Sequence, residues 1–155
     1  MVAVAARILL DTNLLILLVV GSFSRPLIAK FQRTRAFSER DFDRLLELLP
    51  ARARLVATPH VLAETSNLMR GLDGDTLASV RRHLRNLVGE LQETHVPART
   101  AVANALFSRL GLTDAGISVL AADRDVVVVT ADLDLYLGLE HAGLQVVNFN
   151  HYRLR

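Results

Sequence analysis

The chain has 155 residues, of which 51% are hydrophobic and 22% are charged, and its formal net charge is +2. This length predicts one domain spanning residues 1–155, and the apolar content excludes a disordered or polyelectrolyte chain. The absence of cysteine excludes disulfide scaffolds, thiolate metal sites and cysteine catalysis. All of the 18 basic residues except Lys30 are arginines, which nearly excludes a lysine-dependent phosphate loop or Schiff base.

The longest apolar stretch, residues 8–20, is interrupted by Asp11 and Asn13. Its uninterrupted part, residues 14–20, is far shorter than the about 20 residues that a membrane-spanning helix needs. The first residues lack the charged segment and long apolar core of a secretory signal. The sequence therefore predicts a soluble, cytoplasmic protein with no membrane partner.

Apolar spacing predicts strands that alternate with helices. Short apolar runs mark the strands, and capping residues before helical apolar spacing mark the helix starts. The expected strands are residues 8–10, 54–57, 125–130 and 144–149. The expected helices run from the first strand to about Val19, from Ser38 to Pro50, from Thr58 to about Leu72, from Asp73 or Asp75 to about Leu91, from Pro97 to Leu110, from Thr113 to about Ala122 and from Leu133 to His141.

This alternation indicates a three-layer α/β/α fold, in which helices cover both faces of a central, mostly parallel sheet. The four valines at 126–129 form the near-continuous apolar run of a strand that is buried on both faces. In such sheets the functional crevice lies outside the carboxyl ends of the strands. Residues that follow strands, or that begin neighbouring helices, are therefore the first candidates for a functional site.

Four acidic residues occupy such positions. Asp11 follows the first strand, Asp132 follows the valine strand, and Asp114 lies in the first turn of a predicted helix. Glu64 lies beside an apolar face in the helix after the second strand. Each acid alone has an ordinary structural interpretation, such as a helix cap, a turn residue, a favourable charge at a helix N-terminus or a partner of Arg70. Their combination predicts that carboxylates from four distant segments converge on one crevice.

The motifs around these acids resemble those of PIN-domain nucleases over nearly the whole chain. The matching segments are LLDTNLL at 9–15, PHVLAETSNL at 59–68, LTDAGI at 112–117 and VVTADLDLY at 128–136. The resemblance implies an α/β fold whose acidic quartet binds Mg²⁺ or Mn²⁺ and cleaves RNA phosphodiester bonds. The positions that match the catalytic, metal-binding acids are Asp11, Glu64, Asp114 and Asp132.

Other polar residues of these motifs are expected to orient the metal ligands or to bind phosphate. They are Thr12, Asn13, Thr130 and Asp134. Asp134 is also the alternative to Asp132 as the fourth ligand, and Asp132 is favoured because it lies nearer the strand. Hydrolysis of a phosphodiester needs charge neutralisation and a deprotonated water, which one or two hard divalent cations held by carboxylates can supply.

A polyanionic substrate also needs basic surface near the acids. A segment without acids carries the candidate RNA-binding residues Arg25, Lys30, Arg33 and Arg35. The alternative interpretation is an ordinary solvated helix face, which is favoured for a second group at Arg81, Arg82 and Arg85. With only two tyrosines and six phenylalanines, the composition does not indicate base stacking.

Other classes of protein remain open. A haloacid-dehalogenase-type phosphatase also places an aspartate after the first strand, but the DTN motif at 11–13 lacks the second aspartate of that chemistry. A degenerate PIN-like module could bind RNA or protein without catalytic activity. Within the nuclease hypothesis, the resemblance suggests the toxin of a toxin–antitoxin pair, which would form a homodimer and be neutralised by an antitoxin protein.

Overall fold

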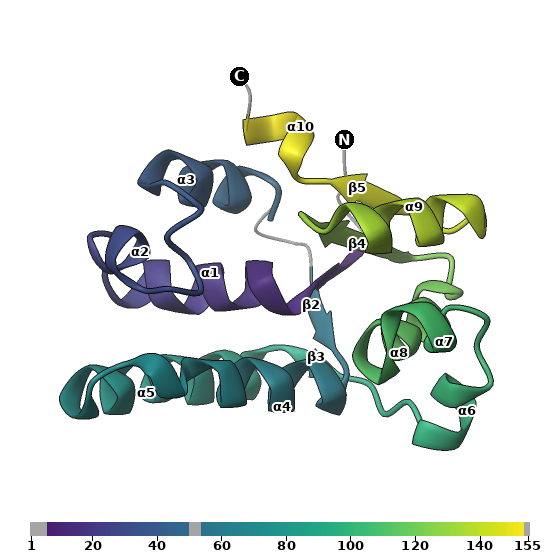
Figure 1. Ribbon diagram of the computed structural model, residues 1–155, viewed down its shortest axis with the longest axis horizontal. Helices are drawn as coiled ribbons and strands as arrows, with labels where there is room; N and C mark the ends of the chain where they lie inside the picture. The colour runs from purple at the N-terminus through teal and green to yellow at the C-terminus, as the bar shows by residue number, and fades with distance from the viewer. Residues whose placement is uncertain (1–5, 50–53, 154–155) are drawn as a thin grey trace.

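In a computed structural model that describes residues 6–49 and 54–153, five strands form one parallel sheet between two layers of helices (Figure 1). The strands lie in the order β3-β2-β1-β4-β5, and every neighbouring pair is parallel. Their bounds are β1 (Arg7–Leu10), β2 (Arg54–Ala57), β3 (Gln92–Glu93), β4 (Val126–Thr130) and β5 (Val146–Asn148). The predicted three-layer α/β/α fold is confirmed.

Helices cover both faces of the sheet. Their bounds are α1 (Thr12–Phe23), α2 (Leu27–Lys30), α3 (Glu39–Glu47), α4 (Pro59–Leu68), α5 (Gly74–Glu90), α6 (Ala98–Val102), α7 (Phe107–Leu110), α8 (Leu112–Ala121), α9 (Leu133–His141) and α10 (Asn150–Arg153), with a 3-10 turn at Met69–Gly71. Figure 1 shows α1, α2, α3 and α5 on one side of the sheet, and α6 to α9 on the other. Within residues 6–49 and 54–153, no helix has the length and apolar character that a bilayer span requires.

The two central strands, β1 and β4, define the edge at which a site can form. From β1 the chain passes to β2 on one side, whereas from β4 it passes to β5 on the other side. This reversal of direction is a topological switch point, and the crevice that it opens lies at the carboxyl ends of the two strands. All residues of β4 are buried, as its valine run predicted, and α1 is buried from Leu14 to Gly21. Asp11 follows β1 and Asp132 follows β4 at this edge.

The helix predicted from Pro97 to Leu110 is instead two short helices, α6 and α7. The side chain of Asn104 breaks it, because its oxygen accepts a hydrogen bond from the Leu106 N–H at 2.9 Å and its amide donates to Ser118 Oγ at 3.2 Å. An asparagine that satisfies nearby backbone in this way competes with the helical hydrogen bonds.

Other elements also differ from the sequence prediction. Helix α8 begins at Leu112, after Gly111 with a φ of 88°, so Thr113 lies inside the helix rather than capping it. The last strand is shorter than residues 144–149, and the two exposed polar residues of β3 give no strand signal in the sequence. Pro50, the predicted end of the helix that Ser38 caps, lies outside the described residues, and α3 ends at Glu47.

Close packing of α1 against α3 depends on Gly21. A Cβ built at this position would lie 2.6 Å from Cε2 and 2.9 Å from Cγ of the buried Phe42 ring, and still closer to Cδ2. We expect Gly21→Ala to lower the free energy of unfolding by about 1–3 kcal/mol in a urea titration, because the helix and the ring must move apart. Gly89→Ala in α5 is the control, since nothing lies within 4 Å of its added Cβ. Equal effects of the two substitutions would contradict this packing.

Candidate active site

Asp11 is fixed in place at the junction of β1 and α1. Its Oδ1 accepts a hydrogen bond from the Leu14 N–H at 2.8 Å and so caps α1. Its Oδ2 accepts hydrogen bonds from the Thr130 hydroxyl, at the end of β4, and from the Ala131 N–H at 3.3 Å. Burial of this residue, which is only 4% exposed, raises the pKa of its carboxyl. The hydrogen bonds oppose that shift, and the charge of Asp132 adds to it.

Asp132 begins the next helix along this edge, α9. Its Oδ1 accepts a hydrogen bond from the Leu135 N–H at 3.1 Å, and its own N–H donates to Thr130 Oγ1 at 3.0 Å. The Thr130 hydroxyl therefore donates to Asp11 and accepts from Asp132, so it fixes the two acidic segments relative to one another. Asp134, the alternative fourth ligand, lies in the first turn of α9 and is exposed, as Asp132 is. The charge of Asp132, by contrast, acts on the buried Asp11.

Glu64 reaches the same region from α4. Its Oε2 accepts a hydrogen bond from the Thr113 hydroxyl of α8 at 2.6 Å. The two helices pack closely, because a Cβ added to Gly116 of α8 would lie 3.5 Å from His60 Nδ1 of α4. Thr113 directly precedes Asp114, so this contact between helices brings Glu64 and Asp114 together. The sequence offered no signal for the Glu64–Thr113 hydrogen bond, because the two residues are 49 positions apart.

Asp114 is the residue on which the other three predicted acids act together. Its pKa is raised to about 7, first by burial and then by the charges of Asp132, Asp11 and Glu64. Asp132, Asp11 and Glu64 therefore all lie within electrostatic reach of Asp114. Among the residues that the structure describes, however, no three carboxylate or imidazole groups lie close enough together to hold a metal ion directly.

The chemistry of this donor set suits a hard divalent cation. Carboxylate and hydroxyl oxygens are the ligands that Mg²⁺ and Mn²⁺ prefer, and Mg²⁺ commonly keeps several waters while binding one or two carboxylates. Carboxylates that are held apart can therefore share one ion through water. Beside Asp11, the buried Thr12 Oγ1 has no hydrogen-bond partner within the described part of the chain. A cation at this edge would relieve the repulsion among the acids.

The predicted RNA-binding residues fall into two groups. Arg25 is engaged on α3, where its guanidinium lies 2.6 Å from an Asp43 carboxylate oxygen and 5.0 Å from the centre of the Phe42 ring. The other basic residues of the group are exposed and form no ion pair with any described residue. They are Lys30, Arg33 and Arg35. Of the remaining predicted polar residues, Thr12 and Thr130 are buried, whereas Asn13 is exposed.

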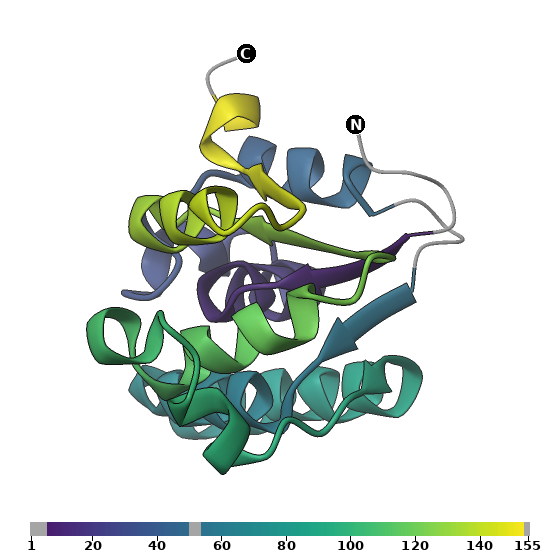
Figure 2. The same cartoon turned by 90° about the vertical axis from the view of Figure 1, so that its right-hand side faces the viewer.

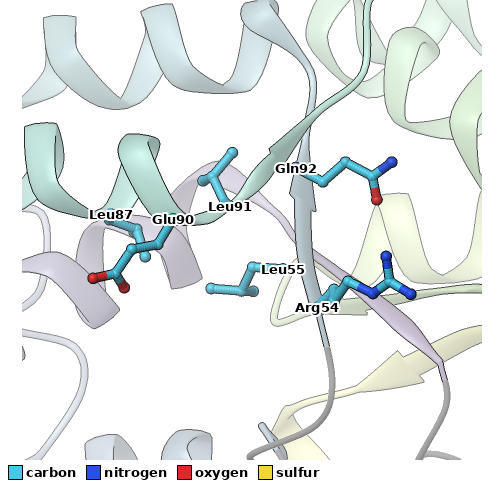
Figure 3. A pocket seen from close by; sticks show the side chains of 6 residues that line it. All are labelled: Arg54, Leu55, Leu87, Glu90, Leu91 and Gln92. Carbon is cyan, nitrogen blue, oxygen red and sulfur yellow. The ribbon is translucent and has the colours of Figure 1, made fainter.

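A surface hollow lies away from the acids, between the start of β2 and the end of α5 (Figure 3). It is lined by Arg54, Leu55, Leu87, Glu90, Leu91 and Gln92. Because β2 is parallel to β1, the start of β2 lies at the amino edge of the sheet, opposite the carboxyl ends that precede Asp11 and Asp132. This hollow therefore takes no part in the acidic site.

Comparisons with known proteins support the fold alone. No protein-family model and no curated protein matches the chain. Among solved structures, the chain is similar to the crystal structure of PAE2754 from Pyrobaculum aerophilum, with a TM-score of 0.57 and 15% sequence identity. The match covers 97% of this chain and 95% of that chain, so the two share their architecture over nearly their full lengths.

Proposed function

We propose that this protein is a PIN-like, Mg²⁺- or Mn²⁺-dependent ribonuclease that hydrolyses RNA phosphodiester bonds. The observation that carries the proposal is the convergence of acids from four separate segments, with Asp11, Glu64 and Asp132 all acting on Asp114. The convergence occurs at the switch point of a parallel sheet, where open α/β folds place their ligands. The PIN-like motifs at these four positions support the same activity.

The four acids have distinct roles in this proposal. Asp11 would be the central ligand, because three hydrogen bonds hold its carboxylate in one orientation. Asp132 and Glu64 each use one oxygen in a hydrogen bond, which leaves the other free to bind the metal or one of its waters. Asp114, whose pKa is raised by burial and by the charges of the other carboxylates, would be held in its ionised form by a bound cation. A bound divalent ion supplies neutralisation of phosphate charge and a lowered pKa for the attacking water.

Exposed basic residues would bind the RNA backbone. Lys30, Arg33 and Arg35 lack ion-pair partners within the described ranges, so binding phosphate would not require an existing ion pair to break. Arg25 would contribute less, because it is already paired with Asp43.

The toxin of a toxin–antitoxin pair is the biological role that we propose for this nuclease, acting as a homodimer. Helix α9, which begins at Asp132, exposes apolar side chains that a second copy or an antitoxin could cover, Leu133 at 56% and Leu137 at 48% exposure. A gene for a small DNA-binding protein next to this one would favour the toxin role. Its absence would favour a stand-alone RNA-processing enzyme.

The second candidate is a PIN-like module that binds RNA or protein without catalysis. The separation of the carboxylates favours it, since no three described acidic or histidine side chains are close enough to hold an ion directly. Metal-dependent turnover separates the two candidates.

The test is cleavage of labelled single-stranded RNA with Mg²⁺ or Mn²⁺ and with EDTA. We expect cleavage that needs the metal, and a loss of roughly 10- to 100-fold in Asp132→Asn, as for residues that orient or complete a metal site. Asp134→Asn, at the alternative fourth ligand, should lose less activity than Asp132→Asn. A larger loss in Asp134→Asn would assign the fourth position to Asp134 rather than to Asp132. Metal binding without any cleavage would favour the binding module, and cleavage in EDTA would contradict the metal requirement.

A further inference from the structure

Two aromatic side chains, Tyr136 of α9 and His151 of α10, lie side by side on the surface. Their ring centroids are 6.1 Å apart and their planes meet at 74°, an edge-to-face arrangement. His151 is exposed and Tyr136 is partly exposed. The Tyr136 hydroxyl donates a hydrogen bond to Glu140 one turn later on α9, which fixes the direction of the ring.

This aromatic pair lies next to the acidic site. Tyr136 is one helical turn after Asp132, and its N–H donates to the Asp132 carbonyl at 3.0 Å. His151 is held nearby by its neighbour Asn150, whose Nδ2 donates to the Ala131 carbonyl at 2.8 Å. The turn that follows β4 therefore carries an acid of the site and also anchors both rings.

The chain just after the exposed basic residues contacts α10 through Arg153. Arg153 donates a hydrogen bond to the Ala36 carbonyl at 2.5 Å, and its guanidinium lies 4.7 Å from the centre of the Phe37 ring. Its Nε lies 3.3 Å from an Asp41 carboxylate oxygen of α3. Figure 1 shows α10 between α3 and α9, and Figure 2 shows it above α9. Arg153 thus joins α10, which carries His151, to the chain segment that includes the exposed Arg35.

We infer that Tyr136 and His151 form a platform, beside the acidic site, on which one unpaired base of a single-stranded RNA stacks. The inference rests on the proposed nuclease function and assigns its substrate class. A duplex keeps its base faces covered, whereas a single strand presents them to aromatic rings. The Glu140 carboxylate beside the Tyr136 hydroxyl disfavours a phosphate at this position, so the neutral face of a base is the complementary group. The aromatic content of the sequence does not reveal this platform, because two rings are sufficient when the fold places them together.

Binding in EDTA tests the platform without cleavage. The probe is a fluorescein-labelled single-stranded RNA oligomer, compared with its duplex and with an oligomer in which abasic sugars replace the nucleosides. We expect the wild type to prefer the single strand, and Tyr136→Ala to weaken its binding by roughly 5- to 100-fold, the usual effect of removing one stacking side chain. Tyr136→Phe, which keeps the ring but loses the hydroxyl and its bond to Glu140, should lose much less affinity than Tyr136→Ala. His141→Ala, an exposed histidine at the other end of α9, is the control for His151→Ala.

The abasic oligomer separates stacking from a structural effect. If the platform binds a base, Tyr136→Ala and His151→Ala should bind the abasic oligomer as the wild type does, while losing affinity only for the oligomer that carries bases. Equal loss for both oligomers, or unchanged binding in both variants, would overturn the inference. Binding is measured without metal and cleavage is measured separately with Mg²⁺ or Mn²⁺. A protein that binds in this way in EDTA but never cleaves RNA when the metal is added would refute the nuclease function and leave the platform standing. Metal-dependent cleavage in a protein that binds both oligomers equally would support the nuclease function and refute the platform.

Discussion

Asp11→Asn should lower the rate of metal-dependent RNA cleavage by about 100- to 1,000-fold, as expected when a preorganised charge at a reacting centre is removed. The substitution keeps the shape of the side chain but removes the charge that is expected to bind the metal. It also replaces one hydrogen-bond acceptor with a donor, beside the Thr130 hydroxyl and the Ala131 N–H that now donate to Oδ2. The Thr130 hydroxyl can rotate to accept instead. Because a buried charge is removed at the same time, we expect the free energy of unfolding in EDTA to change by less than about 1 kcal/mol.

Single-turnover cleavage and urea unfolding on the same preparations check this prediction. Asp73→Asn is the matched control, because Asp73 is also a helix N-cap but is exposed and forms no side-chain capping bond in α5. The control should cleave RNA at the wild-type rate. Full activity in Asp11→Asn would show that the acid between β1 and α1 is not part of the catalytic machinery. A large loss of stability would instead assign its three hydrogen bonds a mainly structural role.

The acids that follow the central strands could be predicted from the sequence because each of them lies at the end of a local signal. The apolar run before Asp11 and the valine run before Asp132 mark two buried parallel strands, and such strands align their carboxyl ends. Ser38 as the cap of α3, and Gly143 after α9 with a φ of 75°, were local signals of the same kind. Residues near the end of a clear element are therefore placed well by sequence alone.

Contacts between distant segments could not be predicted. The Thr113 hydroxyl fits the pattern of a helix cap, yet it hydrogen-bonds to Glu64 because α4 and α8 pack together. The break at Asn104 depends likewise on Ser118, 14 positions away. The pairing of Tyr136 with His151 follows from the docking of α10 beside α9, which leaves no trace in local spacing. Tertiary packing overrides local propensity at each of these places.

In the absence of metal, the stability of the protein should fall as the pH rises from about 4 to about 8. The carboxyl of Asp114 has a pKa of about 7 in the folded protein, against an ordinary value of 3.8, so the folded state holds its proton more tightly than the unfolded state does. The associated stability is fully present below the ordinary value and is lost as the pH passes through about 7. Asp11, whose pKa is also raised, contributes in the same direction.

Urea unfolding in EDTA across this range should show a loss of about 1–2 kcal/mol in the wild type, after allowance for solvent screening of a partly exposed group. The free energy of unfolding of Asp114→Asn should fall less over this pH range, since its amide does not titrate. Asp134→Asn should behave like the wild type. Each variant differs from the wild type at a single residue, so the difference between Asp114→Asn and the wild type isolates the acidic site. The ion pair of Asp125 with Arg7, which lowers the pKa of Asp125 to about 2, does not interfere because it titrates well below this range.

Adding Mg²⁺ should reverse this loss, and only where the acids are ionised. At a concentration about 100 times its dissociation constant, a cation that binds the folded protein alone stabilises it by about 2.7 kcal/mol. We expect stabilisation of this order in the wild type at high pH, little at low pH where protons occupy the same carboxylates, and a smaller effect in Asp114→Asn at either pH. Stabilisation that is independent of pH, or that is unchanged in Asp114→Asn, would place the cation elsewhere on the protein. Metal and proton would then not compete, and the four acids would have to be explained by packing rather than by catalysis.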